Sequence, residues 1–391
     1  MSVIKFNGID IQNISKINTV GIQNITRFYP ALTEEADSEK TLWSWGVNNY
    51  GQLGDGSTTN HSSPIQVGSD TDWDQLAGGN RHALVLKSDG SLWAWGRNNY
   101  GQLGDGSTTD HSSPVQVGSE TNWDQLAGGG YHSLAIKSDS TLWAWGYNAV
   151  GELGQGDTTY RSSPVQVGSD TDWSQAKGGN NHSLALKSDG TLWVWGWNSA
   201  GQLGQGDTTD RSSPVQVGSE TNWDQIAGDS YHSIALKTNG SFWSWGRNDY
   251  GQLGDGSTTY RSSPIQIGSL TNWDQVVGGG FHSLALKSDG TLWSWGRNDY
   301  GQLGLGDSGD VTNRSSPVQI GSGTDWTGVY CGYSFSIAIK TDGTIWSWGR
   351  NNDGQLGDGS TTNRSSPTQI GSDTNWDQAV SSYHSLALRS S

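Results

Sequence analysis

The sequence predicts an all-β protein, a seven-bladed β-propeller with four-stranded blades and a short β arm ahead of it. The first observation is a Leu/Phe/Ile-Trp-x-Trp-Gly motif that occurs seven times, starting at residues 42, 92, 142, 192, 242, 292 and 345. Five spacings are therefore 50 residues and the last is 53, a period typical of propeller blades. The second observation is composition, since 57 Gly and 22 Trp with few strong helix formers favour strands and turns.

Each repeat has room for four short strands, which in the first full repeat are residues 65–67, 72–77, 82–87 and 92–96. The Asp89-Gly90 pair between two apolar runs predicts a tight hairpin. Leu84-Val85-Leu86 is apolar on both faces, so we expect this strand to be covered on both sides. Sheets that stack face to face around an axis provide such cover, which is the arrangement of a propeller.

The two ends of the repeat region predict a closed ring. The last motif starts at Ile345, and the sequence ends at Ser391 before a further motif could occur. We expect residues 41–46 to supply the missing strand to the blade that residues 383–389 begin. A clasp of this kind removes the free sheet edges of an open array.

Composition and charge exclude several classes of protein. With 22 Lys+Arg against 38 Asp+Glu, the net charge of −16 argues against nucleic acid and against an anionic membrane surface as partners. The sequence has no apolar run of 18 residues, so no membrane insertion is expected. A single Cys excludes a disulfide framework, and residues 1–30 lack the apolar core of a signal peptide.

The repeat itself resembles a known family. The pattern Gly-x-x-His-Ser-Leu-Ala-Leu-Lys-x-Asp-Gly-x-Leu-Trp-x-Trp-Gly-x-Asn-x-x-Gly-Gln-Leu-Gly is similar to the repeat of the regulator of chromosome condensation family, over residues 41–391. The resemblance implies a seven-bladed propeller. It also implies functions that differ between branches, namely guanine-nucleotide exchange, UV-B sensing, enzyme inhibition and scaffolding, and a fold does not choose among them.

Neither nucleotide exchange on chromatin nor light sensing fits these residues well. The negative charge opposes contact with phosphate. The Trp content is explained by structure, because 21 of the 22 Trp occupy two repeated positions and only Trp197 lies outside them. Trp43 and Trp45 share one face of their strand, so we assign them to packing between blades.

The sequence predicts no catalytic site, no cofactor and no metal site. Six repeats carry His at one strand position, and the seventh carries Phe335, a pattern that favours packing over a metal site; the six are His82, His132, His182, His232, His282 and His384. The series Asp70-x-Asp72-x-Asp74 resembles the start of a calcium loop but lacks its Gly and its final Glu. Cys331 is expected to be a small buried apolar residue.

Loop positions that differ between the near-identical repeats carry Arg, Tyr and Trp, the residue types enriched at binding hot spots. We predict that they form one binding face for a protein or a glycan, with neutral variation of a solvated loop as the alternative. The candidate residues are Arg97, Tyr100, Tyr147, Trp197, Arg247, Tyr250, Arg297 and Tyr300.

The segment before the propeller has its own repeat of 11 residues, seen in residues 7–17 and 18–28. We predict a β arm at residues 1–30 that docks onto another chain or mediates self-assembly, followed by an acidic linker at 31–40. A small flap packed on the propeller is the alternative. The apolar side chains expected to dock are Ile9, Ile11, Ile14, Ile22, Ile25 and Phe28.

This arm resembles short Asn-Gly-Ile/Val-x-Ile-x-x-Ile-Ser-Lys units at the start of virion proteins of tailed bacteriophages. The resemblance implies a non-enzymatic virion protein of the tail, baseplate, fibre or capsid surface. In that case the arm would bind other virion proteins and the propeller a host surface protein or glycan. The alternative is a cellular, cytoplasmic interaction propeller, an inhibitor or regulatory scaffold, and less so a Trp-based UV sensor.

Overall fold

The computed structural model describes residues 5–6, 9–10, 39–228 and 230–391. Contacts divide the chain into two units, Met1–Ser38 and Glu39–Ser391. In the first unit, β1 (Lys5–Phe6) pairs with β2 (Ile9–Asp10) in antiparallel fashion. Of the predicted docking side chains, Ile11, Ile14, Ile22, Ile25 and Phe28 lie outside the described residues, and of Ile9 the backbone alone is described.

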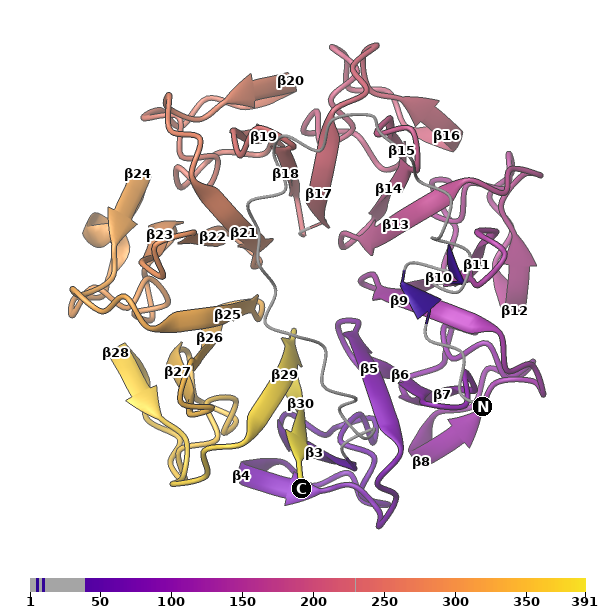
Figure 1. The fold of residues 1–391 in the computed structure, drawn as a ribbon, viewed down its shortest axis with the longest axis horizontal. Coiled ribbons are helices and arrows are strands. Elements are labelled where there is room, and N and C mark those ends of the chain that lie inside the picture. The colour runs from indigo at the N-terminus through magenta and orange to yellow at the C-terminus, as the bar shows by residue number, and fades with distance from the viewer. Residues whose placement is uncertain (1–4, 7–8, 11–38, 229) are drawn as a thin grey trace. The chain divides into compact units, whose positions relative to one another are not determined.

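The second unit is a ring of seven four-stranded antiparallel sheets, as the sequence predicts (Figure 1). Six blades are continuous in sequence and run from an inner to an outer strand. They are β5 (Trp73–Gly78), β6 (His82–Lys87), β7 (Leu92–Gly96) and β8 (His111–Gln116); β9 (Trp123–Gly128), β10 (His132–Lys137), β11 (Leu142–Gly146) and β12 (Arg161–Gln166); β13 (Trp173–Gly178), β14 (His182–Lys187), β15 (Leu192–Gly196) and β16 (Arg211–Gln216); β17 (Trp223–Gly228), β18 (His232–Lys237), β19 (Phe242–Gly246) and β20 (Arg261–Gln266); β21 (Trp273–Gly278), β22 (His282–Lys287), β23 (Leu292–Gly296) and β24 (Arg314–Gln319); and β25 (Trp326–Cys331), β26 (Phe335–Lys340), β27 (Ile345–Gly349) and β28 (Arg364–Gln369).

The seventh blade joins both ends of the propeller, which confirms the predicted clasp. Its strand order is β29 (Trp376–Ser381), β30 (His384–Ser390), β3 (Lys40–Gly46) and β4 (His61–Gln66). β3 pairs with β30 along seven residues, from Lys40 opposite Ser390 to Gly46 opposite His384. The ring therefore closes through backbone hydrogen bonds between β30 and β3, neither of which is left as an edge strand.

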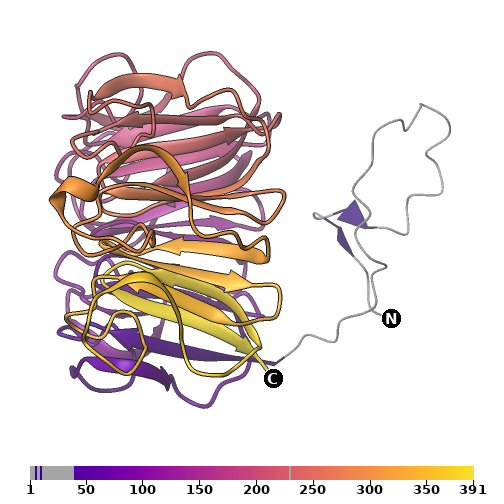
Figure 2. The ribbon, with the colours of Figure 1, turned by 90° about the vertical axis from the view of Figure 1, so that its left-hand side faces the viewer.

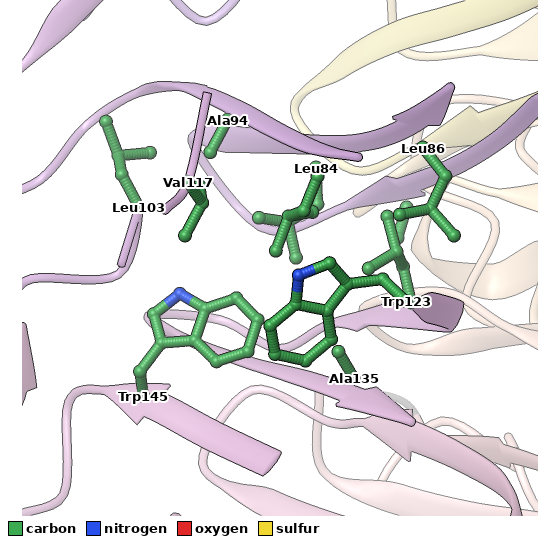
Figure 3. Close-up of a cluster of buried hydrophobic side chains, with 11 residues drawn as sticks. Leu84, Leu86, Ala94, Leu103, Val117, Trp123, Ala135 and Trp145 are labelled. Atoms are coloured by element: carbon green, nitrogen blue, oxygen red, sulfur yellow. The ribbon is translucent and has the colours of Figure 1, made fainter. Parts of the chain in front are cut away.

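The core lies between neighbouring blades. In one such layer, Leu84 and Leu86 of one blade pack against Trp123 and Trp145 of the next, and all four side chains are buried (Figure 3). The second Trp of each Trp-x-Trp pair is fully buried, whereas the first is half-buried. Large aromatic side chains thus fill the wedge between sheets, where burial of apolar area stabilises the ring most.

The Gly-Gln-Leu-Gly loop fastens each blade to the next. Trp145 donates its indole N–H to the carbonyl of Gln102 at 2.9 Å. Gly104 adopts a φ of +81°, and a Cβ there would lie 2.7 Å from Nε1 of Trp145. Asn98 holds the same loop from inside, since its Oδ1 accepts a hydrogen bond from the backbone N–H of Leu103 at 2.9 Å. Glycine is required at residue 104 because both its positive φ and its contact with Trp145 exclude a side chain.

The three additional residues of the last 53-residue spacing fall in a surface loop. The short 3-10 helix η2 (Asp310–Thr312) forms there, between β23 and β24. Within the described ranges, no helix is long and apolar enough to span a membrane. Turned on its side, the propeller shows its strands running between two opposite faces, and the loops on these faces are the surfaces open to partners (Figure 2).

Candidate functional site

The variable loop positions gather on one face of the propeller. This is the face where the inner strand of each blade ends, the second begins and the third ends. The backbone N–H of Arg97 donates to the carbonyl of Arg81 at 2.8 Å, so the loop after each Trp-x-Trp-Gly motif is paired with the residue before each strand His. We call this surface the arginine–aromatic face; its members are Tyr50, Arg81, Arg97, Tyr100, Tyr131, Tyr147, Tyr160, Trp197, Tyr231, Arg247, Tyr250, Phe281, Arg297, Tyr300, Tyr333, Arg350 and Tyr383.

Four tyrosines form a cluster on one side of this face. The ring centroid of Tyr147 lies 4.9 Å from that of Tyr100 and 4.9 Å from that of Tyr160. Tyr131 joins them at 5.8 Å from Tyr100. Tyr160 is 43% exposed. Burial raises the pKa of Tyr147 to about 12, with the neighbouring Tyr160 and Glu152 as further causes. Tyr147 therefore keeps its hydroxyl proton at neutral pH, and the cluster presents aromatic rings and hydroxyls to a partner.

A second cluster surrounds Phe281. The guanidinium carbons of Arg247 and Arg297 lie 5.1 and 5.5 Å from its ring centroid, and the ring of Tyr250 lies 5.4 Å away. Tyr231 stacks on the same ring at 5.3 Å. These are cation–π and aromatic contacts between loops of consecutive repeats. These contacts fix the positions of the Arg and Tyr side chains in the unbound protein.

Trp197 extends this second cluster. Its ring lies 5.8 Å from that of Tyr231 in an edge-to-face arrangement. Arg97 joins the tyrosine cluster, with its guanidinium carbon 5.6 Å from the ring centroid of Tyr100 and 5.3 Å from that of Tyr131. The structure thus brings seven of the eight predicted residues into two clusters, while Tyr300 contacts Arg350 at 5.8 Å. All eight predicted residues are half-buried, so they are packed side chains rather than free loop tips.

The sequence-based prediction missed several members of the face. Arg81 and Tyr383 precede a strand His, Tyr50 occupies the position of Tyr100 in another repeat, and Tyr333 stacks on Tyr383 at 4.9 Å. An alignment of all seven repeats marks the first three positions as variable. Tyr333 lies one residue closer to the central channel, and its contact across blades follows only from the ring geometry.

Two neighbouring blades lack an Arg or aromatic side chain at three of the variable positions, which carry Val150, Asn181 and Ala200. The buried residue beneath these positions is Glu152, where the other six repeats have Gln. Its carboxylate accepts hydrogen bonds from the backbone N–H of Val150 at 2.9 Å and from the amide of Asn181 at 3.2 Å. Burial raises the pKa of Glu152 despite these bonds.

The inner strands surround a central channel that contains a cavity of about 380 Å³. One position on these strands carries Ala, Val or Tyr in six blades and Lys177 in the seventh; the six are Ala77, Ala127, Ala227, Val277, Tyr330 and Val380. The Lys177 side chain reaches water within the channel, but surrounding protein atoms lower its pKa through desolvation. Among the described residues, no carboxylate lies within ion-pair distance of it.

The repeated strand histidines are buried between blades. In five junctions the Nε2 atom lies 2.9–3.0 Å from a Ser hydroxyl of the next blade, as in the pair His82 and Ser133. Burial lowers the pKa of His82 to about 3, with the charges of His384 and His132 as further causes. A neutral imidazole that bridges two sheets is a packing element, as the sequence predicted. Among the described residues, no group of three His, Cys, Asp or Glu is placed to hold a metal ion.

The opposite face of the propeller carries the acidic series that resembles the start of a calcium loop. There Lys87 lies 2.6 Å from Asp70 and 3.1 Å from Asp72, and its ammonium group also stands over the rings of Trp73 and Trp93. The same arrangement recurs at Lys187 with Asp170 and Asp172. Lysine therefore neutralises these carboxylates.

Cys331 is half-buried and lines the channel, which differs from the fully buried position expected from the sequence. The equivalent position in other blades carries a glycine at the end of the inner strand, such as Gly78 or Gly128. The prediction was wrong about burial because closure of the ring places this position beside the channel.

Models of one family match most of the propeller. The model of the RCC1-like domain matches residues 162–387, and models of the regulator of chromosome condensation (RCC1) repeat match residues 40–86 and 89–136, with a second such model at 73–102 and 123–152. Among curated proteins, no relative matches the sequence.

Solved propellers superimpose on this one over most of its length. Human WBSCR16 does so with a TM-score of 0.80 at 22% identity, covering 90% of this chain and 100% of that one. Prp20p from Saccharomyces cerevisiae gives 0.81 at 23% identity, covering 90% and 92%. Yeast RCC1 (Prp20) crystallised with Kap60 gives 0.80 at 21% identity, covering 96% of each chain. At these identities the likeness concerns the fold.

Proposed function

Because the chain belongs to the regulator of chromosome condensation (RCC1) repeat family, we propose that it is a non-enzymatic interaction propeller that binds a partner protein through its arginine–aromatic face. The observation that supports this proposal is the pair of clusters around Tyr100 and Phe281. Aromatic and Arg side chains held by one another lose little conformational freedom on binding, which favours affinity. The Prp20p structure is described together with its binding to Gsp1p and histones, and yeast RCC1 was solved bound to Kap60, so relatives of this fold bind proteins.

A combined variant tests the proposal. Trp197→Ala, Tyr147→Ala and Arg247→Ala together remove one anchor from the Tyr100 cluster and two from the Phe281 cluster. Asp124→Ala with Asp224→Ala, on exposed positions of the opposite face, is the matched control. Proteins retained by the wild-type chain from extracts of its source are identified, and the dissociation constant of the purified partner is then measured by calorimetry.

We expect the combined variant to bind the partner at least about tenfold more weakly, because hot-spot truncations each cost about 1–2 kcal/mol or more. The control is expected to bind as the wild-type chain does. Near-ultraviolet circular dichroism shows whether the variants keep their packing. Equal affinity of the combined variant and the control would mean that the binding surface lies elsewhere.

The virion role stays a separate prediction. It depends on the resemblance of residues 7–28 to bacteriophage virion proteins, and most of this segment lies outside the described residues. Deletion of residues 1–30 tests it, since the arm is then expected to be needed for incorporation into a particle but not for binding through the propeller. The match to RCC1-type propellers favours the cellular interaction propeller between the two roles.

A further inference from the structure

We propose that Arg81 and Arg97 form a carboxylate-binding site on the arginine–aromatic face, which receives acidic side chains of the partner protein. The assignment of the ligand to a partner rests on the proposed function. The site itself follows from a comparison of repeats within this chain.

The chain shows what an equivalent arginine binds. Arg247 pairs with the carboxylate of Asp249, and Arg297 pairs with that of Asp299, two residues further along in each case. Residues 97–109 and 247–259 are identical except at one position, where Asn99 replaces Asp249. Arg97 therefore lies in a loop of the same sequence as that of Arg247 but lacks the carboxylate within its own loop.

The two arginines without a carboxylate share one aromatic ring. The guanidinium carbon of Arg81 lies 5.0 Å from the ring centroid of Tyr50, and that of Arg97 lies 5.1 Å from the same centroid. Tyr383 flanks Arg81 at 5.6 Å, and Tyr131 flanks Arg97 at 5.3 Å. Within the described part of the chain, neither guanidinium takes part in an ion pair, and the buried Nε of Arg97 has no hydrogen-bond partner.

The geometry leaves the terminal Nη donors of both arginines available, whereas the Nε of Arg97 is buried. A cation–π contact uses the flat face of the guanidinium group, whereas its N–H donors point outward in the plane of the group. Those donors match the two oxygens of a carboxylate in a forked arrangement. The aromatic neighbours thus fix the positions of the two guanidinium groups but accept no hydrogen bonds from their N–H donors. This arrangement is expected of an anion-binding site.

A carboxylate fits this site better than a nucleic acid phosphate chain. The equivalent sites at Arg247 and Arg297 hold carboxylates, so the loop geometry suits that group. The net charge of −16 on the chain repels a polyanion over its whole length. One or two carboxylates on a folded partner need only the local positive charge of Arg81 and Arg97.

Two single substitutions test whether the carboxylate within the loop decides if an arginine can bind an external carboxylate. Asn99→Asp gives Arg97 the internal carboxylate that Arg247 has, and Asp249→Asn removes that carboxylate from Arg247. The full chain is labelled with ¹⁵N and titrated with a terminally blocked diglutamate peptide, and separately with inorganic phosphate at the same ionic strength. The side-chain Nε–Hε signals are assigned with the variants Arg81→Lys, Arg97→Lys and Arg247→Lys.

We expect the peptide to shift the Arg81 and Arg97 signals to saturation in the wild-type chain and to leave the Arg247 signal unchanged. Asn99→Asp is expected to weaken binding at Arg97 at least about fivefold, and Asp249→Asn is expected to create a response at Arg247. The proposal is overturned if Arg97 does not respond, if Asn99→Asp binds equally well, or if phosphate binds more tightly than the peptide. If the peptide binds as expected but the combined face variant keeps its partner, the carboxylate site stands and the proposed function fails.

Discussion

His132 and Ser183 form a hydrogen bond across the junction between two blades, with 2.9 Å between Nε2 and Oγ. The Ser183 hydroxyl has a single proton and donates it to the carbonyl of Glu152 at 2.8 Å, so the imidazole Nε2 must be the donor to Ser183. Trp195 donates to the same carbonyl at 2.8 Å. The backbone carbonyl of Glu152 thus accepts hydrogen bonds from both Trp195 and Ser183, and Ser183 in turn accepts one from His132 of the preceding blade.

Two junctions of the ring lack this relay, one with Phe335 at the His position and one with Ala83 at the Ser position, and the second offers a stabilising substitution. Ala83 stands where five other blades have the accepting Ser, and both ring nitrogens of His384 are buried without a hydrogen-bond partner among the described residues. Ala83→Ser is expected to raise the free energy of unfolding by about 1 kcal/mol, because it supplies the missing acceptor. Urea unfolding followed by Trp fluorescence measures the change.

Ser133→Ala is the matched control for this substitution. It removes the acceptor of His82, which lies 2.9 Å away, and leaves a buried donor unsatisfied. We expect it to lower the free energy of unfolding by about 1–3 kcal/mol. A loss of stability in Ala83→Ser of similar size would show that the closing junction has no room for the hydroxyl.

The buried histidines predict a loss of stability in mild acid. Burial lowers the pKa of His132 and His384 to about 4, and that of His182 and His282 to about 3, from an ordinary value of 6.5. As the pH falls below about 6.5, the unfolded chain binds protons that the folded chain excludes, so stability present above this pH is lost on the way to pH 3–4. Each His is expected to lower the free energy of unfolding by up to about 1.4 kcal/mol per pH unit.

Chemical unfolding at pH 7.5, 6.5, 5.5 and 4.5 measures this dependence. The carboxylates that gain protons last as the pH falls include Asp55 and Asp358. Burial raises their pKa values, but hydrogen bonds outweigh it and hold them below the ordinary value of 3.8, so their contribution disappears only in stronger acid. A flat profile between pH 6.5 and 4.5 would contradict the assignment of neutral, buried imidazoles.

Lys177, the cation that stands where the other inner strands carry Ala, Val or Tyr, predicts a further stabilising substitution. Lys177→Ala introduces the residue found at the equivalent positions 77, 127 and 227. Desolvation lowers the pKa of Lys177 in the folded chain below the ordinary value of 10.5, which the unfolded chain keeps. The charged amine therefore destabilises the folded state at neutral pH, and this loss of stability disappears once the pH rises above 10.5. We expect a small gain at pH 7 that shrinks towards pH 11, since water in the channel screens part of the charge. A gain that does not change with pH would point to packing instead of charge.

Glu152 predicts a pH-dependent effect of opposite direction. Its pKa is raised by burial, so the stability contributed by this residue is present below the ordinary value of 4.5 and is lost as the pH rises through the higher folded value. Glu152→Gln, which restores the residue of the other six repeats, is expected to stabilise the protein by about 1 kcal/mol at pH 8 and to have little effect near pH 4. Thermal unfolding at both pH values measures it, and a loss of stability at pH 8 would show that the Asn181 contact requires the charge.

The sequence by itself determined the ring of this protein. The spacing of the Trp-x-Trp-Gly motif, the Asp-Gly hairpins and the two-sided apolar strands are local signals that repeat seven times, and their period already required seven blades and the clasp between residues 41–46 and 383–389. The variable loop positions, with Arg97, Trp197 and Arg247 among them, were visible for the same reason. Each repeat serves as a reference for the other six.

The tertiary structure alone decided which of those side chains meet. Tyr333 and Tyr383 stack although they lie 50 residues apart, and Arg81 and Arg97 share the ring of Tyr50 from a different blade. The carboxylate partner of Arg247 is local, since Asp249 lies two residues along where Arg97 has Asn99. The rings of Tyr50 and Phe281, which Arg97 and Arg247 contact, come instead from other blades, and these contacts follow only from the closed ring. A repeat fixes what every blade has in common, whereas closure of the ring determines the contacts between the residues in which the blades differ.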